Sequence, residues 1–147
     1  MTIDSGRTGS LTMTGGGARP IKVLIVDDDP RVRGALRTLL DADPTFHVVG
    51  DAGSPAQALR LVEQHEPAVA LVDVRIPTER DGLSLIETLA NKRGVPVIAM
   101  SLPSALEEPA IAAGAARFLT KGTSPERMIA AIRATADIGV GRGGAAR

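Results

Sequence analysis

The chain has 147 residues, of which 44% are hydrophobic and only two, both Phe, are aromatic. A chain of this length can bury one core, and Val, Ile, Leu and Ala must build most of it. The absence of Cys excludes disulfides and thiolate metal sites and favours a reducing, cytoplasmic location. The 17 basic residues balance 17 acidic ones, but more of the basic ones lie near the ends. The body is therefore mildly acidic and a poor candidate for direct nucleic-acid binding.

Two segments of biased composition flank the body of the chain. Residues 1–19 are rich in Gly, Ser and Thr, and residues 139–147 are rich in Gly and Arg, so we expect flexible tails around one domain at 20–138. Residues 1–19 lack the apolar stretch of a signal peptide, and no run is long enough to span a membrane. The sequence thus predicts a soluble domain with no membrane partner.

Apolar runs and helical patterns alternate five times between these tails. The runs typical of buried strands are 21–26, 46–50, 68–72, 95–100 and 116–120. The helical patterns are 30–42, 54–65, 82–92, a weak one at 105–113, and 125–137. Three of the helices start with a capping side chain followed by a proline, at Asp29-Pro30, Ser54-Pro55 and Ser124-Pro125. Right-handed crossovers between such strands predict a single doubly wound α/β domain with a five-stranded parallel sheet.

The fourth helical pattern contains Pro109, which inside a helix removes a hydrogen bond and clashes with the preceding turn. The helix can begin after Ser104, with Glu107 completing a capping box, or it can begin late, with Glu108 as the cap and Pro109 at the first position. We expect this segment to be short or mobile, because very short helices are marginal on their own.

Polar side chains stand where four of the expected strands end. Asp27 and Asp28 follow the first strand, Asp73 the third, Ser101 the fourth and Lys121 the fifth. The carboxyl ends of parallel strands meet at one edge of the sheet, where open α/β sheets bind their ligands. The sequence therefore places three carboxylates, a hydroxyl and an ammonium at the same edge.

This set of groups suits a metal and a phosphoryl group. Carboxylates on neighbouring strands repel one another unless their pKa values rise or a cation neutralises them. Hard oxygen ligands with open positions favour Mg²⁺, and one carboxylate would stay free as a nucleophile. Lys121 and Ser101 are not needed to bind a metal, but together with Mg²⁺ they can hold the oxygens of a phosphoryl group on that carboxylate.

Six motifs follow one another along the chain. They are Val-Leu-Ile-Val-Asp-Asp-Asp-Pro (23–30), Leu-Val-Asp-Val-Arg-Ile-Pro (71–77), Asp-Gly-Leu (81–83), Val-Ile-Ala-Met-Ser (97–101), Ala-Gly-Ala (113–115) and Phe-Leu-Thr-Lys-Gly (118–122). In this order they resemble the CheY-like receiver domain of bacterial two-component response regulators. The stretch at 121–133 is most similar to receivers that precede LuxR-type helix-turn-helix domains. The resemblance implies a flavodoxin-like (βα)5 sheet with strand order 2-1-3-4-5.

The resemblance also implies the chemistry of a switch. Asp73 would accept a phosphoryl group from a sensor histidine kinase, Ser101 and Lys121 would hold its oxygens, and Phe118 would be the aromatic residue of the switch. Phosphotransfer and dephosphorylation would be self-catalysed, so the chain is expected to be a switch and not a turnover enzyme. The output would be a downstream protein or a DNA-binding domain of a longer regulator, and a homodimer is possible.

The same resemblance implies how Mg²⁺ is held. Asp28 would ligate it directly, with Asp27, Asp73 and the main-chain carbonyl of Arg75 contributing. The loop from Asp73 to Gly82 departs from the usual pattern, because it carries one residue more.

Other interpretations of these residues stay open. The Asp residues after the first strand can form a solvated turn, Ser101 can be a turn residue, and Phe118 can be ordinary core. A flavodoxin-like mononucleotide binder shares the sheet, but it needs a Gly- and Ser/Thr-rich phosphate cradle where this chain has three Asp residues. A receiver-fold scaffold that works without phosphorylation is the third alternative. We interpret His47 and His65 as structural.

Overall fold

The structure is a computed structural model that describes residues 19–102 and 104–146. The tail expected at the N-terminus therefore lies, apart from Arg19, outside the described residues. Five parallel strands form one sheet in the order β2-β1-β3-β4-β5. Their bounds are β1 Ile21–Val26, β2 Phe46–Ala52, β3 Val69–Asp73, β4 Val97–Ser101 and β5 Arg117–Thr120. The predicted fold class and strand order are confirmed, and each strand begins and ends within two residues of its expected bounds.

The helices follow the strands in the expected alternation. They are α1 Pro30–Asp41, α2 Pro55–His65, α3 Glu79–Glu87 with a π-helical continuation at Thr88–Lys92, a 3-10 turn at Ser104–Leu106 leading into α4 Glu107–Ala113, and α5 Pro125–Ala146. Asp29 and Ser54 cap α1 and α2 through their side chains, as the sequence predicted. Within the described ranges, none of the helices combines the length and apolar character that a membrane crossing requires.

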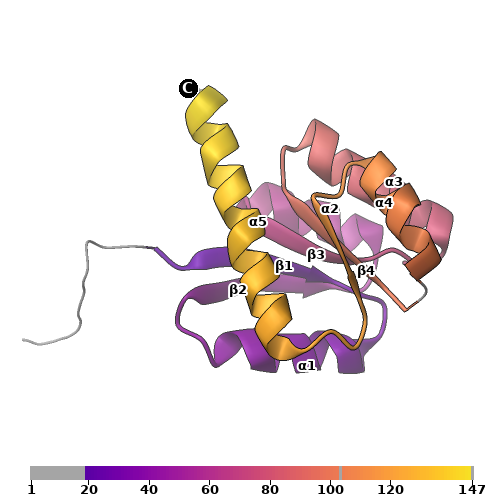
Figure 1. Cartoon of the computed structure of the whole chain (residues 1–147), viewed down its shortest axis with the longest axis horizontal. Coiled ribbons are helices and arrows are strands. Elements are labelled where there is room, and N and C mark those ends of the chain that lie inside the picture. Colours follow the sequence, from indigo (N-terminus) through magenta and orange to yellow (C-terminus); the bar gives the residue numbers. More distant parts are fainter. Residues whose placement is uncertain (1–18, 103, 147) are drawn as a thin grey trace, which may run out of the picture.

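Helices cover both faces of the sheet, which produces two cores (Figure 1). Val23 and Ile25 of β1 belong to the core that includes side chains of α1 and α5, whereas Leu24 and Val26 belong to the core that includes α2, α3 and α4. Successive strand side chains point to opposite faces, so a strand buried on both sides must be a continuous apolar run. This explains why the strands could be recognised in the sequence.

The third helix begins earlier than its apolar pattern indicated. The Thr78 hydroxyl accepts a hydrogen bond from the Asp81 main-chain N–H at 3.1 Å and donates to the Asp81 carboxylate at 2.7 Å. This reciprocal cap starts α3 at Glu79, so the expected start at residue 82 is wrong by three residues.

The short fourth helix accommodates Pro109 in its first turn. Because α4 begins at Glu107, Pro109 is the third helical residue, where a main-chain N–H would have no partner within the helix. Both predicted starts, after Ser104 and at Pro109, are therefore wrong. The expected shortness is confirmed, since α4 has seven residues. Mobility of this segment stays a prediction.

The last helix is longer than expected. Met128, Ile132 and Ala136 face the core, as the apolar stripe predicted, but α5 continues to Ala146 and its end extends beyond the sheet (Figure 1). The expected end of the helix at 137 is thus wrong, whereas the flexible tail expected at 139–147 stays a prediction. Extending an existing helix adds one hydrogen bond per residue, so it can continue beyond the part that packs. The domain boundary at 138 stays a prediction.

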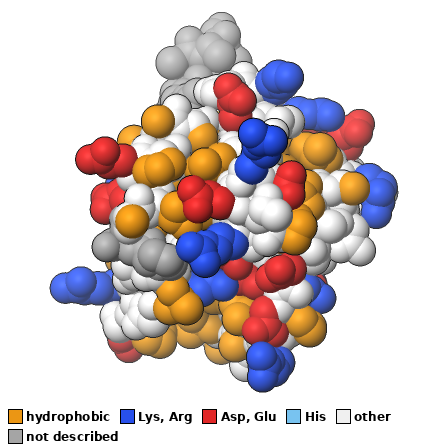
Figure 2. Space-filling model, turned by 90° about the vertical axis from the view of Figure 1, so that its right-hand side faces the viewer, with side chains coloured by type: hydrophobic (Ala, Val, Ile, Leu, Met, Phe, Trp, Pro, Cys, Tyr) orange, Lys and Arg blue, Asp and Glu red, His pale blue; other side chains and the backbone are white. Residues whose placement is uncertain are grey.

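Charges on the surface are mixed. On the side of the molecule seen in Figure 2, acidic and basic side chains are interspersed with hydrophobic ones. Basic side chains therefore do not gather into one patch on this face.

Candidate functional site

The carboxyl ends of four strands bring the predicted polar residues together. Asp73 ends β3 and Ser101 ends β4, and both are buried, while Asp27 follows β1 and is fully buried. Lys121 follows β5, with its side chain 24% exposed. One carboxylate oxygen from each of Asp27, Asp28 and Asp73 lies within 4.8 Å of the other two. These three aspartates are called the acidic cluster below.

The Lys121 ammonium lies between two carboxylates of the acidic cluster. Its Nζ donates to Asp73 Oδ2 at 3.0 Å and lies 2.9 Å from Asp27 Oδ2. The second contact is an ion pair without hydrogen-bond geometry, so among the described residues Asp27 Oδ2 has no hydrogen bond. The other oxygens accept from the main chain, Asp27 Oδ1 from the Asp29 N–H at 2.9 Å and Asp73 Oδ1 from the Arg75 N–H at 3.0 Å. Both carboxylates are therefore fixed from one side.

Burial and neighbouring charges have opposite effects on the pKa values of Asp73 and Lys121. Burial raises the pKa of Asp73, and this effect outweighs the hydrogen bonds from Lys121 and the Arg75 N–H, which lower it. For Lys121, burial alone lowers the pKa, but the ion pair with Asp27 and the hydrogen bond to Asp73 outweigh burial and leave the pKa raised. The site thus holds a permanent cation beside a carboxylate whose ionised form is costly to bury.

A small pocket opens at Asp73. It has a volume of about 100 Å³ and is lined by Asp73, Arg75, Ser101, Leu102 and Lys121. A carboxylate, a hydroxyl and an ammonium therefore surround one solvent-accessible space next to the acidic cluster.

Phe118, the aromatic residue predicted for the switch, lies in β5 and does not line this pocket. It pairs in register with Ala99 of β4, and its half-buried ring packs against the core on the α2, α3 and α4 side. Phe118 therefore contributes to the core, as the ordinary interpretation held, and a switch role would be additional.

The loop that follows Asp73 is held in place by a glycine. A Cβ on Gly82, in the first turn of α3, would overlap the Val74 carbonyl. The Val74 N–H in turn donates to the Met100 carbonyl at 2.9 Å. Only glycine allows α3 to approach this closely, so Gly82 fixes the chain next to Asp73.

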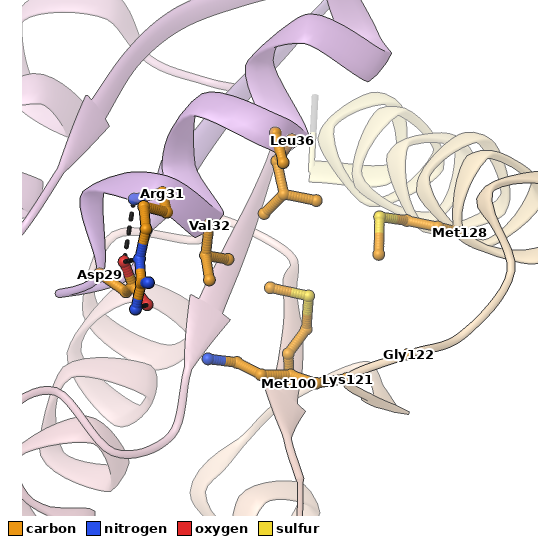
Figure 3. A pocket seen from close by; sticks show the side chains of 9 residues that line it. Asp29, Arg31, Val32, Leu36, Met100, Lys121, Gly122 and Met128 are labelled. Carbon is orange, nitrogen blue, oxygen red and sulfur yellow. Dashed lines mark hydrogen bonds and ion pairs between the residues drawn. The ribbon is translucent and has the colours of Figure 1, made fainter.

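A larger hollow adjoins the site on the side of α1 and α5. Its volume is about 470 Å³, and Val32, Leu36, Met100 and Met128 supply most of its apolar lining. Figure 3 shows these side chains directed toward a common space, with Lys121 at its border. An apolar surface therefore lies beside the polar pocket.

The structure also bears on the alternative interpretations. Full burial of Asp27 excludes a solvated turn for this residue. A mononucleotide cradle is not favoured, because a buried carboxylate occupies the place where phosphate would bind. His47, the second residue of β2, and His65, the last of α2, do not belong to the acidic cluster, and their structural interpretation stays a prediction.

Comparison with known proteins identifies the family and confirms the fold. The family model for the response regulator receiver domain matches residues 23–133. The chain belongs to this family. As a receiver domain it is a signalling module of two-component systems. Receiver domains bind Mg²⁺ at an acidic pocket, and the acidic cluster is the corresponding feature of this chain.

Two curated relatives illustrate the family. The chain is 36% identical over 143 residues to protein-glutamate methylesterase/protein-glutamine glutaminase 5 of Anaeromyxobacter dehalogenans, covering 87% of this chain and 39% of the relative. It is 35% identical over 117 residues to the transcriptional regulatory protein PdtaR of Mycobacterium tuberculosis, covering 78% of this chain and 56% of PdtaR. The chain therefore spans only part of the length of each.

Solved receiver structures superpose on almost their full length. The signal receiver domain of NarL from Mycobacterium tuberculosis gives a TM-score of 0.74 at 30% identity, with 81% of this chain and 98% of that chain covered. The response regulator domain of CheB from Thermotoga maritima gives a TM-score of 0.73 at 26% identity, with the same coverage.

The donor set in the pocket fits a magnesium ion. The acidic cluster offers hard carboxylate oxygens, and Asp27 Oδ2 is buried without a hydrogen bond among the described residues. Such an oxygen is costly to bury unless a cation or donor compensates it. Lys121 supplies part of that compensation, and the exposed carboxylate of Asp28 completes an open oxygen site.

One neighbour of the site was missed in the sequence. The Arg33 guanidinium, from α1, donates to the Asp27 main-chain carbonyl at 2.7 Å and to Asp51 in β2 at 2.9 Å. No spacing rule links these three residues, because the contact depends on how α1 packs beside β2.

Proposed function

We propose that Asp73 accepts a phosphoryl group from a sensor histidine kinase, so that this receiver is a switch and not a turnover enzyme. An Asp73 carboxylate oxygen would form the bond to phosphorus as the phosphorus–nitrogen bond of the phosphohistidine breaks and the imidazole leaves. Self-catalysed hydrolysis of the acyl phosphate would restore the carboxylate. The observation that supports this role is that Asp73 shares its pocket with Ser101 and Lys121.

Asp27, Asp28, Asp73 and the main-chain carbonyl of Arg75 would hold Mg²⁺. When bound, this ion supplies positive charge that neutralises the transferring phosphoryl group. Two observations support the assignment: the close spacing of the acidic cluster, and the burial of Asp27 Oδ2 without a hydrogen bond among the described residues.

Lys121 and Ser101 would hold the phosphoryl oxygens. Lys121 already donates to Asp73 Oδ2. It could therefore donate to a group attached to that carboxylate without reorienting its whole side chain. Ser101 would be drawn toward the phosphoryl group, and Phe118 would follow into the space released. The surface of α4, β5 and α5 would then change its affinity for an output protein, a DNA-binding module or a second copy of the chain.

The hollow between α1 and α5 would receive the kinase. The donor must approach Asp73 from the open edge of the sheet, and Val32, Leu36 and Met128 present an apolar surface beside that approach. Burial of apolar area there would hold the partner while the phosphoryl group is transferred.

Incubating the full chain with acetyl phosphate and Mg²⁺ tests the proposal. We expect intact-mass spectrometry to show one added phosphoryl group on the wild type, almost none on Asp73→Asn, and a normal amount on Asp41→Asn. Asp41 is an exposed carboxylate at the end of α1 and serves as the matched control. Equal mass gain by Asp73→Asn would disprove the assignment.

A further inference from the structure

We propose that Arg33 is a positioning residue of the acidic cluster, which it serves by holding the peptide that joins Asp27 to Asp28. The inference rests on the proposed function, since it concerns the Mg²⁺ site of that function. Arg33 itself would touch neither the metal nor the phosphoryl group, and would act through the main chain.

The Arg33 guanidinium, from α1, connects β2 with the main chain at Asp27. One of its amino groups donates to the Asp27 carbonyl at 2.7 Å, and its Nε donates to Asp51 Oδ1 at 2.9 Å. The Asp27 N–H donates to the Ala52 carbonyl at 3.0 Å. Both main-chain polar groups of Asp27 are thus tied to β2, one directly and one through Arg33.

The surroundings of Arg33 are shaped to keep this geometry. Asp51 is bonded by two arginines, because Arg37 donates to its other carboxylate oxygen at 3.0 Å. A Cβ at Gly53 would lie 2.9 Å from the Arg33 amino group, so the glycine leaves room for it. The planar, forked guanidinium can span two acceptors at once, which a lysine cannot do in the same way.

The held carbonyl matters because of its neighbour in the chain. The Asp27 carbonyl and the Asp28 N–H belong to one planar peptide, so a bond to the carbonyl fixes the orientation of both. Asp28 is exposed, unlike Asp27 and Asp73. Its carboxylate is therefore the member of the acidic cluster whose position depends most on the main chain, and Arg33 determines that orientation.

Mg²⁺ titration of the full chain, without a phosphodonor, tests the inference. We expect Arg33→Ala to raise the half-saturating Mg²⁺ concentration by about tenfold, the lower end of the range for groups that orient metal ligands. Arg37→Ala is the matched control, because it removes the other arginine of the Asp51 pair; within the described chain no hydrogen bond joins Arg37 to the acidic cluster. We expect it to change the value by less than about twofold.

A purely structural role would make the two variants behave alike. Equal half-saturation in Arg33→Ala and Arg37→Ala, beside a wild type that binds Mg²⁺, would overturn this inference and leave the proposed function intact. A wild type that binds no Mg²⁺ would instead overturn the proposed metal site, and this inference with it. If Arg33→Ala does not fold, Arg33→Lys decides: a rise of about threefold or more supports the inference, and a smaller change overturns it.

Discussion

Lys121 and Asp73 are 48 positions apart in the sequence, and the lysine Nζ donates to the aspartate Oδ2 at 3.0 Å. The same ammonium pairs with the fully buried Asp27. One cation therefore compensates two carboxylates at the edge of the sheet, so both of them depend on the same side chain.

Replacing Lys121 with Met should destabilise the fold and strengthen Mg²⁺ binding. The substitution leaves two carboxylates close together without their cation, which costs about 3 kcal/mol in the free energy of unfolding. Removing a positive charge from two proposed metal ligands should also lower the half-saturating Mg²⁺ concentration. Urea unfolding with and without Mg²⁺ measures both effects.

The control for Lys121 is Lys22→Met. Lys22 is exposed in β1 and its ammonium donates to the His65 carbonyl at 3.3 Å. We expect a change within about 0.5 kcal/mol, as for most surface substitutions. If Lys121→Met and Lys22→Met lowered the free energy of unfolding by similar amounts, the special position of Lys121 would be contradicted.

The raised pKa of Asp73 predicts how stability depends on pH. Because burial raises this pKa above its ordinary value of 3.8, ionised Asp73 destabilises the folded state. The cost is absent below the ordinary value and grows as the pH rises, until it is complete above the folded-state pKa. Asp73→Asn stays neutral, so it should be more stable than the wild type at neutral pH, by a difference that shrinks on acidification.

Urea unfolding of the wild type and Asp73→Asn in Mg²⁺-free buffers, from about pH 4 to 7, tests this dependence. The difference between the two proteins cancels the titration of other carboxylates. A difference that stays constant or grows as the pH falls would show that the ionised side chain is not disfavoured by burial.

Gly82 and Gly34 should respond oppositely to substitution by Ala. A Cβ at Gly82 would overlap the Val74 carbonyl, so Gly82→Ala should cost about 3 kcal/mol or more and displace the loop after Asp73. A Cβ at Gly34, in the interior of α1, would meet nothing within 4 Å. Gly34→Ala should therefore raise the free energy of unfolding by about 0.5–1 kcal/mol. Denaturant unfolding gives both values, and equal effects would refute the close approach at Gly82.

Replacing Ser101 with Ala should separate phosphorylation from its consequence. Ser101 lines the pocket but is not the nucleophile, so Asp73 should still gain a phosphoryl group from acetyl phosphate. Phosphorylation should change the NMR chemical shifts of the amides in β5 and α4 much less than it does in the wild type. The reason is that no hydroxyl is left to draw β4 toward the new group. Shift changes of wild-type size would remove Ser101 from the proposed switch.

The pattern of apolar and polar residues was enough to predict the strands and the candidate site residues. Val23 to Val26 and Val69 to Val72 are buried on both faces, so they form continuous apolar runs that no polar position interrupts. Asp27, Asp73 and Lys121 could be grouped before any coordinates because parallel strands end at one edge. The start of a helix could be predicted where a capping residue stands directly before a proline, as at Asp29-Pro30.

Contacts between segments that are distant in the sequence could not be predicted and became visible only in the folded structure. The pairing of Lys121 with Asp27, the reach of Arg33 to the Asp27 carbonyl, and the close approach at Gly82 each join separate elements through space. The length of α5 was also not readable, because its glycine-rich end lacks the apolar pattern on which helix prediction relies. Local patterns record which side chains are buried, whereas distances between elements are fixed only when those elements pack.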